Sequence, residues 1–288
     1  LLQGDVGSGK TIVAMLAMLN AVEEGRQAVL MAPTEILARQ HFQSLGPLAE
    51  AAGIRMEVLT GRDKGKPREA LLADLESGEV DILVGTHAVF QETVTFKDLA
   101  FAVIDEQHRF GVHQRLALSA KATEAPPDLL VMTATPIPRT LTLTAYGDME
   151  VSRLDEKPPG RAPVDMRALP LERLDQVADS IRRAVSDGAR VYWVCPLVEE
   201  SDLVDLAAAE ERYAHLSGMF GDRVGLIHGR LKGPQKDAVM ADLSEGKLDV
   251  LVATTVIEVG VDVPEATVMV IEHAERFGLA QLPQLRGR

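Results

Sequence analysis

An internal duplication constrains the fold of this chain more than any other feature of its 288 residues. Residues 56–87 align with residues 224–255 without a gap at a constant offset of 168 residues, and about 13 of the 32 aligned positions are identical. The identical pairs include Gly61/Gly229, Arg62/Arg230, Lys64/Lys232, Asp74/Asp242, Gly78/Gly246, Asp81/Asp249 and Thr86/Thr254. We therefore expect two copies of one fold.

Short apolar runs alternate with helical stretches in both copies. The runs span residues 28–32, 82–84, 102–104 and 129–132 in the first copy, and residues 191–195, 224–227, 250–253 and 268–271 in the second. Runs that are apolar throughout and separated by helices are typical of parallel strands in a sheet covered by helices. The sequence predicts an α/β fold of two tandem parallel-sheet lobes.

A proline-rich segment separates the two copies. Residues 155–163 read D-E-K-P-P-G-R-A-P, and prolines with a glycine in a polar stretch mark a linker. We expect a first domain over residues 1–154, a linker over residues 155–170 and a second domain over residues 171–288.

The string G-D-V-G-S-G-K-T at residues 4–11 fits the phosphate-binding template G-x-x-x-x-G-K-[ST], and the required apolar helical stretch follows at residues 12–22. Glycines at such positions allow positive φ, so that successive N–H groups point at phosphate oxygens. We expect Lys10 to reach the outer phosphates of a nucleoside triphosphate and the Thr11 hydroxyl to ligate Mg²⁺. The predicted nucleotide-binding residues are Gly4, Asp5, Val6, Gly7, Ser8, Gly9, Lys10 and Thr11.

Two carboxylates, Asp105 and Glu106, follow the apolar run at residues 99–104. That run indicates a strand buried on both faces, and ligands of open α/β sheets bind at the carboxyl ends of the strands. Asp105 is expected to hold Mg²⁺, and Glu106 to orient and deprotonate the attacking water. Together with the phosphate-binding string, the pair predicts an ATP hydrolase that uses Mg²⁺.

The overall charge limits how this chain can bind nucleic acid. The formal net charge is −13, and aromatic residues make up only 4% of the chain. A globally basic surface is excluded, so any nucleic acid is expected to be held by its phosphates through local contacts. The single cysteine, Cys195, lies in an apolar run, and no run approaches the roughly 20 apolar residues of a membrane span. These features predict a soluble cytoplasmic protein.

Polar signatures follow the apolar runs in a fixed order. They are A-P-T at residues 32–34, G-T-H at 85–87, T-A-T at 133–135, H-G-R at 228–230, T-T at 254–255 with G-V-D at 260–262, and Q-L-R-G-R at 284–288. This series resembles the core of superfamily 2 helicases. The strings D-E-Q-H-R-F-G-V at residues 105–112 and T-A-T-P-I-P-R-T at residues 133–140 narrow the resemblance to bacterial RecG-type branched-DNA helicases, over essentially the whole chain. Gln107 favours this group over the transcription-repair coupling translocases, which usually carry Glu there.

The resemblance implies a fold, a function and a set of site residues. RecG-type helicases have tandem RecA-like lobes of the P-loop NTPase fold, bind stalled forks and Holliday junctions, and move on duplex DNA with ATP in recombination and repair. The matching ATPase residues are Lys10, Thr11, Asp105 and Glu106, and the nucleotide-facing residues of the second lobe are Gly260, Asp262 and Arg288. The matching coupling residues are His108, Thr133, Ala134 and Thr135. The matching DNA-backbone contacts are Pro33, Thr34, Thr86, His228, Gly229, Thr254 and Thr255.

The chain departs from the RecG-type pattern near its end. The last family motif has the form Q-x-x-G-R-x-G-R, and this chain stops at its first arginine, Arg288, so the second arginine, the usual arginine finger, is absent. Such a finger contributes about 10³–10⁵ to the rate, so we expect the isolated chain to hydrolyse ATP weakly. Pro283 also stands where these proteins commonly have His. We expect a segment of a longer protein, whose wedge and C-terminal domains would carry the fork specificity.

Three other functions stay open on the sequence alone: a transcription-repair coupling type translocase, a superfamily 2 RNA helicase, or an ATP-gated interaction scaffold. The intact Lys10 and Glu106 argue against the scaffold, because a scaffold needs no activated water. A basic loop in each copy either is solvated or flanks the DNA path. These loops contain Arg62, Lys64, Lys66 and Arg68 in the first copy, and Arg230, Lys232 and Lys236 in the second.

Overall fold

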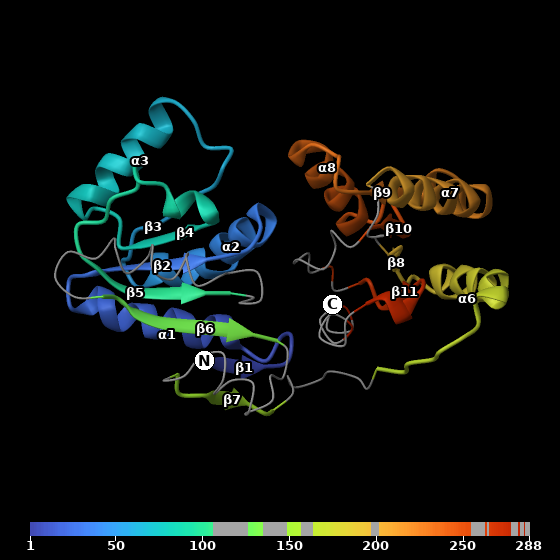
Figure 1. Ribbon diagram of the computed structural model, residues 1–288, viewed down its shortest axis with the longest axis horizontal. Helices are drawn as coiled ribbons and strands as arrows, with labels where there is room; N and C mark the ends of the chain where they lie inside the picture. Colours follow the sequence, from blue (N-terminus) through green and yellow to red (C-terminus); the bar gives the residue numbers. More distant parts are fainter. Residues whose placement is uncertain are drawn as a thin grey trace. The chain divides into compact units, whose positions relative to one another are not determined.

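The computed structural model (Figure 1) describes residues 1–105, 126–134, 149–156, 164–196, 202–254, 263, 265–277, 282 and 285. The chain divides into two compact units, Leu1–Arg161 and Ala162–Arg288. The division falls inside the segment expected to be a linker, and the finer domain bounds stay a prediction.

The first unit is built on a seven-stranded parallel sheet. In spatial order its strands are β3 (Met56–Leu59), β4 (Ile82–Gly85), β2 (Gln27–Met31), β5 (Leu99–Ile104), β6 (Asp128–Thr133), β1 (Leu2–Gly4) and β7 (Ser152–Leu154). Consecutive residues such as Val29 and Leu30, or Leu83 and Val84, are fully buried. Because neighbouring residues in a strand point to opposite faces, both faces of the sheet lie in the core, which explains the uninterrupted apolar runs.

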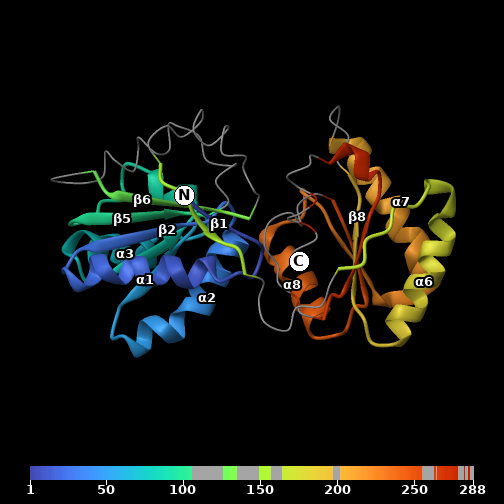
Figure 2. The ribbon, with the colours of Figure 1, turned by 90° about the horizontal axis from the view of Figure 1, so that it is seen from below.

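Helices α1 (Lys10–Glu23), α2 (Glu35–Ala51) and α3 (Lys66–Ser77), with the 3₁₀ turn η1 (His87–Phe90), connect these strands. α1 packs on β2 and β5, α2 packs on β3 and β4, and Figure 2 shows both helices on one face of the sheet. α3 contributes Leu75 to a core cluster with Val29 and Leu83. Since all strands run the same way, the residues that follow β1, β2, β4, β5 and β6 gather at one edge of the sheet.

The second unit has a four-stranded parallel sheet in the order β11 (Val268–Ile271), β8 (Val191–Val194), β10 (Val250–Ala253) and β9 (Val224–Ile227). Its helices are α6 (Leu174–Ser186), α7 (Asp202–Phe220) and α8 (Gly233–Ser244), with 3₁₀ turns η3 (Leu171–Arg173), η4 (Gly221–Arg223) and η6 (Ala274–Arg276). Val191 and Trp193 share a core with residues of α6 and α7, whereas Tyr192 and Leu251 share one with residues of α8. Helices thus cover both faces of this sheet (Figure 2), and the predicted pair of parallel-sheet lobes is confirmed.

The duplication is also present in the strand register. Residues 56–59 of β3 pair in order with residues 82–85 of β4, and residues 224–227 of β9 pair in order with residues 250–253 of β10. Both sets of partners are related by the offset of 168 residues found in the sequence. The connecting helices α3 and α8 are each 12 residues long. The aligned segments therefore form one strand–helix–strand unit twice.

Candidate active site

The loop between β1 and α1 has the backbone that its glycines predict. Gly7 and Gly9 have φ of 76° and 94°, in the left-handed region where a Cβ is strained. Gly4 is required for a different reason, because a Cβ there would lie 2.4 Å from Oγ of Ser8 and 3.0 Å from Cβ of Leu154. The Oγ of Ser8 is itself buried and has no hydrogen-bond partner in the described part of the chain. This tight turn with small residues fits a cradle for a phosphate group.

The Lys10 side chain closes this loop. Its Nζ donates hydrogen bonds to the carbonyl oxygens of Gly4, at 2.7 Å, and Asp5, at 2.8 Å. The N–H of Ser8 donates to the same Asp5 carbonyl at 3.1 Å. Thr11 follows in the first turn of α1, whose N-terminus has no side-chain cap. The lysine and the uncapped N–H groups together place positive charge at the loop.

Asp105 lies directly after β5, at the same sheet edge as the loop after β1, with β6 between the two strands. Its Oδ2 is 2.8 Å from Nε2 of His41, and both residues are only 8% exposed. The sequence reading did not single out His41. The one available signal is its place on the buried face of α2, with Leu37 and Leu45, because a polar side chain in an apolar stripe needs a partner.

The residues expected to contact DNA in the first unit follow β2 and β4. Pro33 and Thr34 come after β2, and Oγ1 of Thr34 caps α2 by accepting a hydrogen bond from the N–H of Leu37 at 3.4 Å. Thr86 comes after β4 and is 3% exposed, and its Oγ1 has no hydrogen-bond partner among the described residues. These residues and Asp105 lie at the same edge of the sheet.

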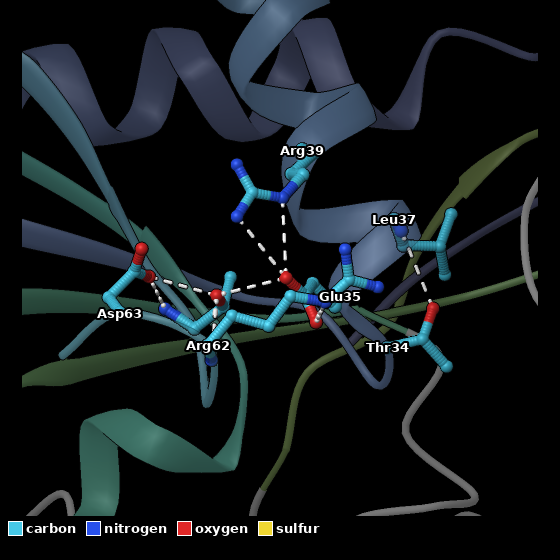
Figure 3. A network of polar contacts seen from close by, with 7 residues as sticks. Thr34, Glu35, Leu37, Arg39, Arg62 and Asp63 are labelled. Carbon is cyan, nitrogen blue, oxygen red and sulfur yellow. Dashed lines mark hydrogen bonds and ion pairs between the residues drawn. The ribbon is translucent and has the colours of Figure 1, made fainter. Parts of the chain in front are cut away.

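A polar network surrounds Glu35 at this edge (Figure 3). Arg62 and Arg39 both point to its carboxylate, with Nε of Arg62 2.8 Å from Oε2 and Nη2 of Arg39 3.2 Å from Oε1. The Thr60 hydroxyl lies 3.1 Å from Oε1 of Glu35 and 2.8 Å from Oδ2 of Asp63. Arg62 belongs to the predicted basic loop, and the structure shows its charge held beside a carboxylate.

The predicted DNA contacts of the second unit also follow strands, and Thr254 is equivalent to Thr86 by the offset of 168 residues. His228 and Gly229 follow β9, and Thr254 follows β10. Within the described residues, neither Oγ1 of Thr254 nor Nδ1 of His228 has a hydrogen-bond partner. The backbone N–H of Thr254 donates to the carbonyl of Ile227 at 3.1 Å. Thr254 therefore repeats the arrangement of Thr86, including the buried hydroxyl.

Other predicted site residues lie outside the described residues: Glu106, His108, Thr135, Thr255, Gly260, Asp262 and Arg288, and also Gln107 and Pro283. Thr133 and Ala134, expected to couple hydrolysis to lobe movement, end or follow β6 and are 2% and 7% exposed. The roles of all these residues stay predictions.

A buried ionic cluster in the second unit has no counterpart among the predicted site residues. Glu272, directly after β11 and 9% exposed, accepts hydrogen bonds from Nε1 of Trp193 and, at 2.5 Å, from Nε of Arg212. The Arg212 guanidinium also lies 5.4 Å from the centroid of the Trp193 ring, within cation–π range. Burial, with Glu272 as the second cause, raises the pKa of the Cys195 thiol to about 12. That thiol therefore stays protonated, and as a thiol rather than a thiolate it is a poor nucleophile.

Comparison with known proteins places the chain among helicases. The family profile described as "DEAD/DEAH box helicase" matches residues 1–144, and the profile "Helicase conserved C-terminal domain" matches residues 172–288. Over its whole length the chain is 54% identical to the ATP-dependent DNA helicase RecG of Escherichia coli O157:H7, of which it covers 42%. It is 52% identical to the RecG of Synechocystis sp., of which it covers 35%. The chain thus spans less than half the length of these relatives.

Solved structures agree with this assignment. A structure of RecG bound to a three-way DNA junction matches all of this chain and 37% of that chain, with a TM-score of 0.79 and 45% identity. Yeast Dbp5 bound to RNA and ADP BeF3 matches with a TM-score of 0.74, all of this chain and 75% of that one, but at 19% identity it shows the fold alone. No helix in the described part of the chain is long and apolar enough to cross a membrane. The RecG-type resemblance read from the sequence is confirmed, and the chain belongs to the DEAD/DEAH box helicase family.

Proposed function

We propose that this chain is the ATP-hydrolysing motor core of a branched-DNA helicase. One observation carries the proposal: a phosphate-binding loop closed by Lys10 and a buried Asp105 share one sheet edge in a chain that is 54% identical to a RecG helicase. A scaffold that only bound ATP would need neither an activated water nor the acidic pair that follows β5.

The residues at this edge suit a nucleotide that is bound together with Mg²⁺. Mg²⁺ prefers oxygen ligands and is usually held by one or two protein groups, with waters and phosphate oxygens completing its shell. Thr11 and Asp105 offer such groups, and no set of three His, Cys, Asp or Glu side chains among the described residues forms a separate metal cage. Thr11 and Asp105 would hold the ion, whose positive charge would offset the negative charge that develops during phosphoryl transfer. Lys10 would exchange two loop carbonyls for phosphate oxygens, and Glu106 would orient and deprotonate the attacking water.

DNA is the second ligand of the proposed motor. The net charge of −13 favours contacts at local points rather than over the whole surface. Thr86 and Thr254 suit this role because their hydroxyls, at equivalent places in the two units, lack partners within the described residues. A RecG structure was solved with a three-way DNA junction, which supports branched DNA as the substrate. The bacterial origin of the RecG relatives supports a cytoplasmic location.

Steady-state ATP hydrolysis tests this function. Because the chain covers 42% of the E. coli RecG, we would measure a chimera in which it replaces the matching segment of that relative. Branched DNA, linear duplex and single-stranded RNA are added separately, with Glu106→Gln as the control. We expect strong stimulation by branched DNA that the control abolishes. Equal stimulation by linear duplex would favour a coupling-type translocase, stimulation by RNA an RNA helicase, and no stimulation a scaffold.

A further inference from the structure

The contact between His41 and Asp105 joins two parts of the first unit that are 64 residues apart in the sequence. As a carboxylate Asp105 can only accept hydrogen bonds, so Nε2 of His41 must carry the hydrogen and donate it to Oδ2 at 2.8 Å. Both residues are 8% exposed, and His41 lies on the buried face of α2 between Leu37 and Leu45. The imidazole is therefore held in place by the packing of the helix, and it holds the carboxylate in turn.

A bond of this kind has a specific consequence for a metal-binding carboxylate. The carboxylate must present an oxygen in one direction, and a donor fixed on its other oxygen prevents rotation about the side-chain bond. Such outer partners orient metal ligands in proteins, and their loss typically costs about 10–100-fold in metal affinity or activity. A buried histidine beside Asp105 meets the geometric requirement for this role.

We propose that His41 is a positioning residue, which orients Asp105 toward the divalent cation that accompanies the nucleotide. The proposal rests on the function proposed above, because it needs Mg²⁺ and ATP at this sheet edge. It assigns His41 no contact with the substrate. Its effect is instead expected in the dependence of nucleotide binding on Mg²⁺.

Two variants separate orientation from packing. His41→Phe keeps a ring of similar volume in the buried site but removes the donor. His41→Gln keeps an N–H donor, because the Gln amide nitrogen can occupy nearly the position of Nε2. Gln43→Ala is the matched control, since Gln43 is an exposed residue of the same helix. Circular dichroism and thermal unfolding show whether each variant is folded.

Calorimetric binding of a non-hydrolysable ATP analogue is measured over a range of Mg²⁺ concentrations and in EDTA. For His41→Phe we expect the Mg²⁺ concentration at half-maximal binding to rise about 10–100-fold, with unchanged affinity in EDTA. The Mg²⁺ midpoint of His41→Gln should lie close to the wild-type value, and that of Gln43→Ala should equal it. In the chimera, the apparent Mg²⁺ constant for hydrolysis should rise more than kcat falls.

Two results would overturn the proposal. In the first, His41→Phe keeps the wild-type Mg²⁺ midpoint. In the second, the Mg²⁺ midpoint of His41→Gln rises as much as that of His41→Phe although both variants are folded, which would make His41 a packing residue. If the wild type itself binds the analogue without any dependence on Mg²⁺, the proposed function fails along with this inference. If the wild type binds the analogue in a Mg²⁺-dependent way and His41→Phe has the same Mg²⁺ midpoint, only the inference about His41 fails and the proposed function stands.

Discussion

The strand–helix–strand units β3–α3–β4 and β9–α8–β10 share one backbone plan at the edge where their second strands begin. In the first unit the N–H of Asp81 donates to the carbonyl of Arg55 at 3.0 Å, and in the second the N–H of Asp249 donates to the carbonyl of Arg223 at 2.8 Å. Each aspartate also accepts a hydrogen bond from its arginine, through the backbone N–H of Arg55 and the guanidinium of Arg223. Both copies therefore keep the same arginine–aspartate contact where the second strand begins.

The residues at the carboxyl ends of the strands differ between the two copies. The first copy has Thr60 bonded to Asp63 and Glu35 at the end of β3, whereas the second has His228 and Leu231 at the positions 168 residues later. The sequence of the second copy also contains no G-x-x-x-x-G-K-[ST] string. The comparison shows that both copies keep the strand register, while the residues at the carboxyl ends of the strands differ.

The largest effect is expected where the two units differ most. Lys10→Ala should lower ATP hydrolysis by the chimera about 10²–10³-fold, the size typical of losing one charge-stabilising donor. The control is Lys247→Ala in the second unit, whose ammonium pairs with Asp242 and Glu245 at the surface and is expected to leave the rate unchanged. A Lys10→Ala rate within twofold of the wild type would show that the first unit is not the hydrolytic one.

A second difference concerns how each unit fixes its central strand. Gln27 at the start of β2 is 3% exposed, and its Nε2 donates to the carbonyls of Leu75, at 2.8 Å, and Val80, at 2.7 Å. The equivalent place before β8 carries Arg190, whose Nη1 donates to the carbonyl of Ser244 at 2.9 Å. Both side chains join a central strand to the C-terminal end of the repeated helix, α3 in the first unit and α8 in the second, but the glutamine does so in the core.

We therefore expect Gln27→Leu to lower the free energy of unfolding by about 3 kcal/mol, because it leaves buried backbone groups without partners. Arg190→Leu should cost about 1 kcal/mol, since water can replace its contacts. Urea unfolding followed by circular dichroism measures the first loss. Fluorescence of Trp193, the single tryptophan of the chain and part of the second unit, follows the second. Equal losses would contradict the comparison.

A smaller effect tests the shared backbone plan. Gly78 follows α3 with φ of 85°, and Gly246 lies two residues after α8 with φ of 76°. An alanine in this left-handed region costs about 1–2 kcal/mol. Gly78→Ala and Gly246→Ala should therefore destabilise their units by similar amounts in urea unfolding. A loss at one position without a loss at the other would mean that the two helix ends are not equivalent.

The smallest effect concerns the basic loops. If both loops flank the DNA path, Lys64→Glu and Lys232→Glu should each weaken DNA binding and reduce the slope of log affinity against log salt by about 1. Both lysines are exposed. Lys97→Glu makes the same charge change before β5, at the opposite edge of the sheet, and should have little effect. Unchanged affinity in the first two variants would leave the loops as solvated surface.

The sequence predicts well what depends on local pattern. Apolar runs predict β2, β4, β5 and β6 of the first unit and all four strands of the second, but not β1, β3 or β7. The offset of the repeat anticipates the matching register of β3–β4 and β9–β10, and strand ends place Lys10, Thr86 and Asp105 at one edge. It predicts poorly the contacts between residues distant in the chain. The local sequence around His41 does not show that this residue contacts Asp105, and the sequence around Glu272 does not show that it contacts Trp193, 79 residues away. The packing of separate elements against one another decides these pairs.

The bonds of Lys10 also bear on how this loop can diverge among related proteins. Both bonds go to main-chain oxygens, and every amino acid supplies a main-chain oxygen. The identity of residue 5 can therefore drift without moving the ammonium, whereas Gly4 is fixed by the close approach of Ser8, and Gly7 and Gly9 by their positive φ. Distant relatives of this lobe should thus be recognisable by the spacing of three glycines and a lysine, even where the other residues of the loop differ in chemistry.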